Sequence, residues 1–318
     1  MKIFKESNDF IQMRLLTIGS GYRGAKIVEL LSKKGIKVNR VPLFKCFAVV
    51  NDEGQLKDIS LKPEKKCLLL KDVSGFVNKV TSIHELYEGS LIVTSLEDDF
   101  GYITSTRLCE KLKDATGEVV ITLALVPQLD TSSIGEIKSR IRELKEASDV
   151  LLLFEGVVGI ERRILKILNL VSLAGEVDAR RRLIGEVVVD TSDVFNTLVN
   201  DGFCIAGYAE RKIPFSLINA LLKRGEDPGT KTRRMLEIVD EALENLSING
   251  DVEDAKSALI VFAGKPDEIT LEGLLLSISR IENINRRMLV RYGDYPLVRA
   301  RKVSVALLFS GIKRFRFT

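Results

Sequence analysis

The sequence lacks the residues from which most metal and disulfide sites are built. It contains one histidine, His84, and four cysteines, Cys46, Cys67, Cys109 and Cys204, with no Cys-x-x-Cys pair. A structural zinc site takes about four such ligands at close spacing. Free cysteines beside apolar runs behave as small hydrophobic residues instead. The pattern therefore favours neither a zinc site nor a disulfide framework.

Long apolar runs are missing as well. No stretch reaches the ~18–20 apolar residues that a membrane-spanning helix requires. The N-terminus, MKIFKESNDF, has no apolar core of signal-peptide length. The net charge is only +4, from 48 basic and 44 acidic residues, which does not favour binding to nucleic acid. We therefore expect a cytoplasmic globular protein with no direct membrane insertion.

Strand-like and helix-like patterns alternate in the first half of the chain. Continuous apolar runs lie at 15–18, 46–50, 67–70, 91–93, 119–126 and 150–154. Such runs are typical of strands buried on both faces of a parallel sheet. An amphipathic helix pattern between the last two, at 134–144, has the 3.6-residue period. The alternation predicts an α/β fold with a doubly wound, mostly parallel sheet.

The second half has a different pattern. One long helical pattern runs from about 159 to 184. After it we expect strands at 187–189, 259–263 and 303–309, and helices at 235–246 and 271 to about 288. The length of 318 residues suits about two domains. We expect a nucleotide-binding-type α/β domain over 1–156, a long central connecting helix over 157–185, and a smaller α+β domain over 186–318.

A glycine-rich segment, GSGYRG at 19–24, matches the pattern G-x-G-x-x-G between the first strand and the first helix. Glycine lets a phosphate approach the backbone, and the N-terminus of the following helix attracts anions. The dinucleotide-binding form also has an acidic residue about 20 residues further on, whereas Asp52 lies 28 residues after Gly24. The motif alone supports a nucleotide site and a ligand-free tight turn about equally.

A second segment, VVDTSDV at 188–194, places two carboxylates between a strand and a helix. Asp190 is a candidate N-cap and Asp193 a first-turn residue, both favourable for the helix dipole. The same carboxylates could orient a water molecule for hydrolysis. Because capping residues are common, the pattern by itself favours the capping interpretation.

In order, these parts resemble the FtsZ/tubulin family of filament-forming GTPases. CFAVVND, at 46–52, is similar to the family's second strand and its Asn-Thr-Asp turn, with Asn51 in the asparagine's place. Asp190 and Asp193 fall on the acidic pair of the family's loop that reaches the next subunit's nucleotide. GDVEDAKSALIVFAGKPDEITLEGLL and ARKVSVALLFSG are similar to parts of its C-terminal domain. The collinear order of these matches carries the resemblance.

The resemblance implies a cytoskeletal protein that binds GTP or GDP, with Mg²⁺ as a further ligand, and acts in processes such as cell division. It implies self-association or assembly with an FtsZ-like partner, with Asp190 and Asp193 as catalytic residues acting on the neighbouring subunit. Asn169 lies within one residue of the family's guanine-reading position. The implied nucleotide-binding residues are Gly19, Ser20, Gly21, Arg23, Gly24, Asn51, Gly101, Thr104 and Asn169.

The chain departs from the family where a glycine run should hold the phosphates. The segment 96–104 reads LEDDFGYIT, with one glycine, Gly101, and three carboxylates, Glu97, Asp98 and Asp99. Each close pair of like charges costs on the order of 1–4 kcal/mol near a protein surface. An acidic helix N-terminus, stabilised by its own dipole, is therefore the favoured interpretation. Arg23 would then contact a phosphate or pair with one of the three carboxylates.

The resemblance implies two alternative functions, and the GSGYRG motif by itself suggests a third. The first is an FtsZ-like protein that forms or regulates filaments, with weak or lost GTP binding and hydrolysis. The second is an active GTPase that polymerises head to tail. The third, a nicotinamide-dependent oxidoreductase using GSGYRG, leaves the second half of the chain unexplained and has only His84 as a catalytic histidine. Because no tail peptide follows Phe309, direct docking to a division-site membrane anchor is not expected.

Overall fold

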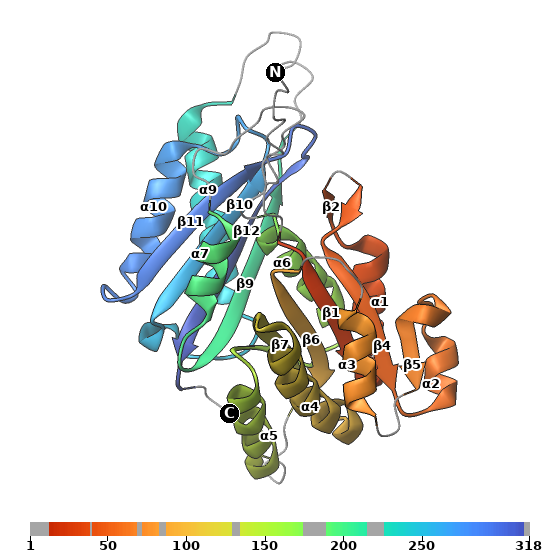
Figure 1. The fold of residues 1–318 in the computed structure, drawn as a ribbon. Coiled ribbons are helices and arrows are strands. Elements are labelled where there is room, and N and C mark those ends of the chain that lie inside the picture. Colours follow the sequence, from red (N-terminus) through yellow and green to blue (C-terminus); the bar gives the residue numbers. More distant parts are fainter. Residues whose placement is uncertain are drawn as a thin grey trace, which may run out of the picture.

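The computed structural model describes residues 13–38, 40–68, 72–82, 87–128, 134–173, 189–214 and 226–314. In these residues a ten-stranded sheet has the order β11-β10-β12-β9-β8-β7-β6-β1-β4-β5 (Figure 1). Its strands are β1 (Leu15–Ser20), β4 (Phe44–Val50), β5 (Lys66–Leu68), β6 (Gly89–Ser95), β7 (Val119–Val126), β8 (Val150–Glu155), β9 (Phe203–Lys212), β10 (Ser257–Gly264), β11 (Leu289–Pro296) and β12 (Lys302–Ile312). A separate pair is formed by β2 (Lys37–Val38) and β3 (Val41–Pro42).

Helices cover both faces of this sheet, as a doubly wound fold requires. Apolar side chains of α1, α6 and α7 pack against one face, and those of α3, α4, α5, α9 and α10 against the other. These helices are α1 (Gly21–Lys34), α3 (Val73–Thr81), α4 (Asp99–Thr116), α5 (Ile134–Ala147), α6 (Ile160–Val171), α7 (Thr191–Leu198), α9 (Pro228–Glu244) and α10 (Leu271–Glu282). The short α2 (Glu53–Asp58) follows β4, and single 3₁₀ turns lie at Pro63–Lys65 and Val252–Asp254.

Within the described residues, which exclude 69–70 of the third run, the six apolar runs of the first half form strands, and this confirms the predicted parallel sheet. Neighbouring strands from β5 through β4, β1, β6 and β7 to β8 pair in parallel. Every residue of β1 and β6 is buried. Burial on both faces explains why these runs are continuously apolar rather than alternating.

The second half continues the same sheet. β9 pairs in parallel with β8 at a single position, Leu152 opposite Cys204, and pairs antiparallel with β12. Ser247 strengthens this thin junction, because its hydroxyl donates to Leu153 O at 2.6 Å and accepts from Ala206 N at 2.9 Å. The predicted helix after Pro228 and the strands at 259–263 and 303–309 are confirmed as α9, β10 and β12.

The predicted long central helix is wrong in its extent. α6 begins after Gly159 and ends at Val171. The Leu173 amide donates to Leu170 O at 3.1 Å, a bond three residues back that tightens the last turn and ends the helix. The remainder of the predicted helix, at 174–185, and residues 187–188 of the predicted strand lie outside the described residues. Val189, the last residue of that strand, is not in a strand.

Two further observations concern the helices. α10 ends at Glu282 rather than near Met288. The Ile284 amide donates to Ile281 O at 3.0 Å, three residues back, instead of continuing the four-residue pattern of an α-helix. Among the helices that the structure describes, none combines the length and apolar character that crossing a bilayer demands.

Candidate functional site

The candidate site lies where the order of the sheet changes direction. The chain passes from β1 outward to β4 and β5, and then returns to β6 on the other side of β1. Ligands of open parallel sheets bind outside the carboxyl ends of the strands at such a point. Here those ends lead into α1 and α4, and a methyl group placed on Gly21 would lie 2.9 Å from the Cα of Gly101. The first turns of the two helices therefore lie against each other.

The sequence predicted a loop at GSGYRG, between the first strand and the first helix. In the structure this segment belongs to the strand and the helix themselves. Gly19 and Ser20 end β1, and Gly21 begins α1 with a φ of +75°. A methyl group on Gly24 would come within 2.1 Å of Val93 O on β6. Glycine at these positions is therefore required by a left-handed backbone and by close contact between helix and strand, whether or not a ligand binds.

Asp98 joins the N-termini of α1 and α4. It is the N-cap of α4, and its Oδ1 accepts a hydrogen bond from Gly101 N at 3.1 Å. Its Oδ2 lies 2.0 Å from the position that a methyl group on Gly21 would occupy. The hydroxyl of Ser20 donates to Gly101 O at 3.0 Å, which ties the end of β1 to the same turn. The predicted acidic helix N-terminus is thereby confirmed.

Arg23 points from α1 toward acidic and carbonyl groups of the same chain. Its Nη1 lies 3.6 Å from Glu97 Oε2 and its Nε 3.7 Å from Glu161 Oε1. Its Nη2 donates to Gly156 O, at the end of β8, at 2.7 Å. The pair with the acidic segment that the sequence offered for Arg23 is therefore present, through Glu97.

The third carboxylate of the segment is paired through a residue that the sequence did not point to. Arg140 on α5 donates from Nη2 to Asp99 Oδ1 at 2.5 Å and from Nη1 to Leu96 O at 2.8 Å. Its guanidinium also lies 5.1 Å from the ring centroid of Tyr102, a cation–π contact. Glu97, Asp98 and Asp99 therefore each have a positive or N–H partner within the chain.

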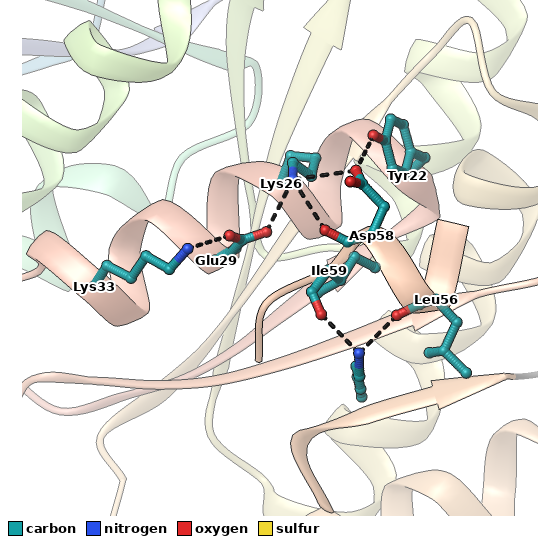
Figure 2. Close-up of polar contacts among 8 residues, drawn as sticks. Tyr22, Lys26, Glu29, Lys33, Leu56, Asp58 and Ile59 are labelled. Carbon is teal, nitrogen blue, oxygen red and sulfur yellow. Dashed lines mark hydrogen bonds and ion pairs between the residues drawn. The ribbon is translucent and has the colours of Figure 1, made fainter. Parts of the chain in front are cut away.

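Polar contacts along α1 hold the segment after β4 in place (Figure 2). Asp58, at the end of α2, accepts hydrogen bonds from the Tyr22 hydroxyl and from Lys26 Nζ, the latter at 3.3 Å. Lys26 Nζ also lies 3.1 Å from Glu29 Oε2, and Lys33 donates to Glu29 Oε1. Tyr22, which follows Gly21, thus anchors α2 to α1.

These contacts shift the pKa values of the acidic groups. Burial alone raises the pKa of Glu29, but hydrogen bonds from Lys33, Lys26 and the backbone of Ser60 lower it to about 2. The hydrogen bond from Tyr22 is the main cause that lowers the pKa of Asp58. The same bond raises the pKa of Tyr22. Glu29 and Asp58 are therefore anionic at neutral pH, as their lysine partners require.

The remaining nucleotide-type residues are only partly brought together. Thr104 is buried in α4, one turn beyond Gly101. Asn51 is exposed just after β4, where the neighbouring Asp52 caps α2 by accepting from Gln55 N at 2.8 Å. Lys66 Nζ donates to Leu56 O at 2.8 Å and to Ile59 O at 2.7 Å, which ties the end of α2 to β5.

The structure does not bring Asn169 to this cluster. Its Oδ1 accepts from Ile36 N at 2.8 Å and its Nδ2 donates to Lys34 O at 3.3 Å. Both partners lie at the C-terminal end of α1, whereas the glycines lie at its start. A helix of 14 residues is about 20 Å long, because each residue rises 1.5 Å. In this chain, Asn169 joins α6 to the end of α1.

Asp190 and Asp193 lie on a different part of the fold. Asp190 caps α7, accepting from Asp193 N at 2.8 Å and from the Ser192 hydroxyl at 2.7 Å. These hydrogen bonds, with Ser192 foremost, lower the pKa of Asp190. Asp193 Oδ1 lies 3.3 Å from Arg291 Nε on β11. α7 packs on β10, β11 and β12, whereas α1 covers β1 and β4 (Figure 1).

Comparison with known proteins identifies the family. Residues 153–317 match the family model of the C-terminal domain of tubulin-like CetZ proteins. This chain belongs to the CetZ family. The resemblance to the FtsZ/tubulin superfamily that the sequence motifs indicated is thereby confirmed.

Relatives of the CetZ family match over nearly the full chain. Tubulin-like protein CetZ1 from Haloferax volcanii is 26% identical, with 94% of this chain and 88% of the relative covered. The structure of that CetZ1 as a GDP-bound monomer superposes with a TM-score of 0.75 at 22% identity, covering 95% of this chain and 96% of the other.

Two further structures share the fold. CetZ2 from Haloferax volcanii, as a GTPγS-bound protofilament, gives a TM-score of 0.75 at 20% identity and covers 96% of this chain and 95% of its own. A variant of FtsZ from M. jannaschii gives 0.69 at 18% identity and covers 95% and 92%. The predicted α/β, tubulin-like fold is confirmed.

The residues at the first turn of α4 do not fit a bound triphosphate. A phosphate there needs free N–H groups, but Asp98 accepts from Gly101 N. Glu97 and Asp99 are 54% and 75% exposed and add negative charge on the open side of this turn. Among the described residues, no group of three His, Cys, Asp or Glu side chains is placed to hold a metal ion.

Proposed function

We propose that this CetZ-family chain is a cytoskeletal protein that forms or regulates filaments with weak or lost GTP binding and hydrolysis. The observation that carries the proposal is the position of Asp98. Its carboxylate lies between the first turns of α1 and α4 and accepts an N–H of the turn that would otherwise face a phosphate. An internal anion thus takes the favourable place at two helix N-termini.

Charge supports the same conclusion. A nucleotide at this edge would bring several phosphate charges close to Glu97, Asp98 and Asp99. Each like-charge pair at ~4 Å costs on the order of 1–4 kcal/mol near the surface. Arg23 cannot offset the repulsion freely, because Glu97, Glu161 and Gly156 O already surround its guanidinium. A nucleotide would have to displace these contacts to gain the arginine.

Filament formation or regulation is inferred from the relatives. The CetZ2 structure is a GTPγS-bound protofilament. We propose that this chain associates with itself or with a CetZ- or FtsZ-like partner. Asp190 and Asp193 lie at the start of α7, which packs on β10 to β12 and not beside α1. We propose that they face the neighbouring subunit, because they are remote from the glycines of their own chain.

Calorimetric titration with GTP and GDP tests the nucleotide part. We expect the wild-type chain to bind either nucleotide with a Kd weaker than about 1 mM, equivalent to about −4 kcal/mol. A triple variant, Glu97→Gln, Asp98→Asn and Asp99→Asn, should bind GTP at least about tenfold more tightly, because the repulsion is removed. Asparagine is as good an N-cap as aspartate, so α4 is preserved.

The matched control changes three exposed carboxylates of α4 and α5, Glu110→Gln, Asp114→Asn and Glu146→Gln, and should leave affinity unchanged. A micromolar Kd for GTP in the wild-type chain would contradict the proposal. So would phosphate release that rises steeply with protein concentration and is lost in Asp193→Ala, which is the result expected of an active head-to-tail GTPase. Electron microscopy of the wild-type chain with and without GTP shows whether the chain forms filaments without nucleotide or forms no filaments by itself.

A further inference from the structure

A basic hollow lies at the end of the second half of the sheet. It has a volume of about 730 Å³ and is bounded by the end of β9, the residue after β10, and the turn between β11 and β12. In Figure 1 this turn is the dark-blue connection at one end of the second half, opposite the start of β11. The cationic side chains on its walls are Lys212, Lys265, Arg299, Arg301 and Lys302.

The three segments around the hollow are fixed to one another by the backbone. Leu297 N donates to Gly264 O at 2.6 Å, which holds the turn over the end of β10. Ile213 N donates to Arg301 O at 2.9 Å, which holds the end of β9 against the start of β12. The segments that carry the cations are therefore held together by backbone hydrogen bonds.

Most of this positive charge has no acidic partner among the described residues. Lys302 Nζ pairs with Glu210 Oε1 at 2.5 Å, and Lys166 also pairs with that oxygen. Within the part of the chain that the structure describes, the side chains of Lys212, Lys265, Arg299 and Arg301 make no ion pair or hydrogen bond. By contrast, Arg211 beside them pairs with Glu237 and Glu241. Four uncompensated cations around one hollow attract an anionic ligand.

The turn that carries Arg299 and Arg301 also has two exposed apolar residues. Leu297 and Val298, which open the turn, are 37% and 45% exposed. Arg299 follows them directly, so two aliphatic side chains and the basic walls belong to one short turn. Exposed apolar residues flanked by Lys and Arg are typical of surfaces that lie in the headgroup region of an anionic bilayer.

We propose that this corner docks onto an anionic membrane surface. Leu297 and Val298 enter the headgroup region, while lipid phosphates occupy the hollow between Lys212, Lys265, Arg299 and Arg301. Two weak signals, apolar and electrostatic, together give stable peripheral binding without a membrane-spanning segment. A nucleic acid is a poorer fit, because it offers nothing to the aliphatic pair and the lining residues include no aromatic side chain for base stacking.

Vesicle co-sedimentation tests the proposal. The full chain should sediment with vesicles of phosphatidylcholine and phosphatidylglycerol in equal parts and stay in solution with pure phosphatidylcholine. The charge-reversal pair Arg299→Glu and Arg301→Glu should lower the partition coefficient at least about tenfold, because attraction turns to repulsion. The matched control is Arg286→Glu and Arg287→Glu, two exposed arginines before the opposite end of β11, which should change binding less than about twofold.

Leu297→Ser with Val298→Ser tests the apolar part and should weaken vesicle binding while preserving its salt dependence. Thermal unfolding of each variant, close to that of the wild-type chain, shows that the fold is intact. Equal binding to neutral and anionic vesicles, or an equal loss in the control pair, would overturn the proposal. So would binding to glycerol phosphate as tight as binding to vesicles, or binding to DNA or polyglutamate with none to vesicles.

Discussion

The carboxylate of Asp98 lies against Gly21, so that a single acidic side chain meets the first turns of two helices. Asp98 caps α4 through Gly101 N, and its second oxygen occupies the space beside the left-handed backbone of Gly21. Helix N-termini attract anions because their first N–H groups are unpaired. In this chain the anion is part of the protein, and the glycine lets it come close.

Gly21→Ala should therefore destabilise the protein by about 3 kcal/mol, because alanine disfavours the φ of +75° and its methyl group would meet Asp98 Oδ2 at 2.0 Å. Gly117→Ala is the matched control. Gly117 has a φ of +68° with no heavy atom within 4 Å of an added methyl group, so its cost should be about 1 kcal/mol. Urea unfolding gives both values. An equal loss of unfolding free energy in the two variants would mean that the contact with Asp98 does not restrict position 21.

Asn169→Ala separates a structural role from a nucleotide-reading one. We expect a loss of about 1 kcal/mol in the free energy of unfolding, since the hydrogen bonds to Ile36 N and Lys34 O disappear. Asn78→Ala, at an exposed position of α3, should change stability by less than about 0.5 kcal/mol. The triple variant Glu97→Gln, Asp98→Asn and Asp99→Asn, in which we expect tighter GTP binding, serves as the background for the binding measurement. If Asn169→Ala weakened GTP binding in it without changing stability, the structural role would be wrong.

Glu29 gives the fold a defined dependence on acid. Its pKa is lowered from 4.5 to about 2, so its stabilisation is complete above about pH 4.5 and is lost as the pH falls toward 2. Glu29→Gln should cost about 2 kcal/mol at neutral pH, and the difference from wild type should shrink at about pH 3. Unfolding by urea at the two pH values measures this. Glu110→Gln, an exposed change within α4, should have almost no effect. A cost for Glu29→Gln that stays constant down to pH 3 would contradict the assignment.

The sequence was sufficient to predict the parallel strands of the first half, β10 and β12, because burial gives these strands apolar runs. It did not predict β9 or β11, since polar and charged residues interrupt the apolar pattern of both strands. β1 and β6 are buried throughout, so their continuous apolar runs had only one stable environment. The end of α6 was not predicted, since apolar spacing continues past Val171 and the 3₁₀ bond of Leu173 leaves no clear mark in the sequence. The placement of Asn169 failed for a similar reason, because its distance from the glycines depends on which end of α1 packs on α6.

The charge pairs of the candidate site show where sequence reasoning ends. A pair between Arg23 and the acidic segment was one of two alternatives that the sequence offered, because Arg23 belongs to GSGYRG at the same sheet edge. Arg140 was missed, since it lies on α5, 41 positions after its partner Asp99 in the sequence. Nothing in the pattern of an amphipathic helix distinguishes the one arginine that turns back toward a neighbouring helix. Ion pairs of this kind are properties of the packed fold.

A buried ion pair in the second half allows a prediction in which stability depends on pH. Arg234 is buried and donates to Glu268, which is also buried, and to Glu226 Oε2 at 2.5 Å. Arg234→Met should cost about 3–5 kcal/mol at neutral pH, because it leaves the Glu268 carboxylate buried without its partner. Burial already raises the pKa of Glu268, and loss of the arginine should raise it further.

A carboxyl with a raised pKa is tolerated in its protonated form, so the penalty of Arg234→Met should be smallest at low pH and grow as the pH rises through the pKa of the buried group. Urea unfolding of the variant and the wild type between about pH 5 and 8 measures the difference. Adding Glu268→Gln removes the charge and should restore at least about half of the loss at pH 8. A loss that is independent of pH, and that Glu268→Gln does not relieve, would show that Arg234 stabilises the fold through packing of its side chain rather than by neutralising Glu268.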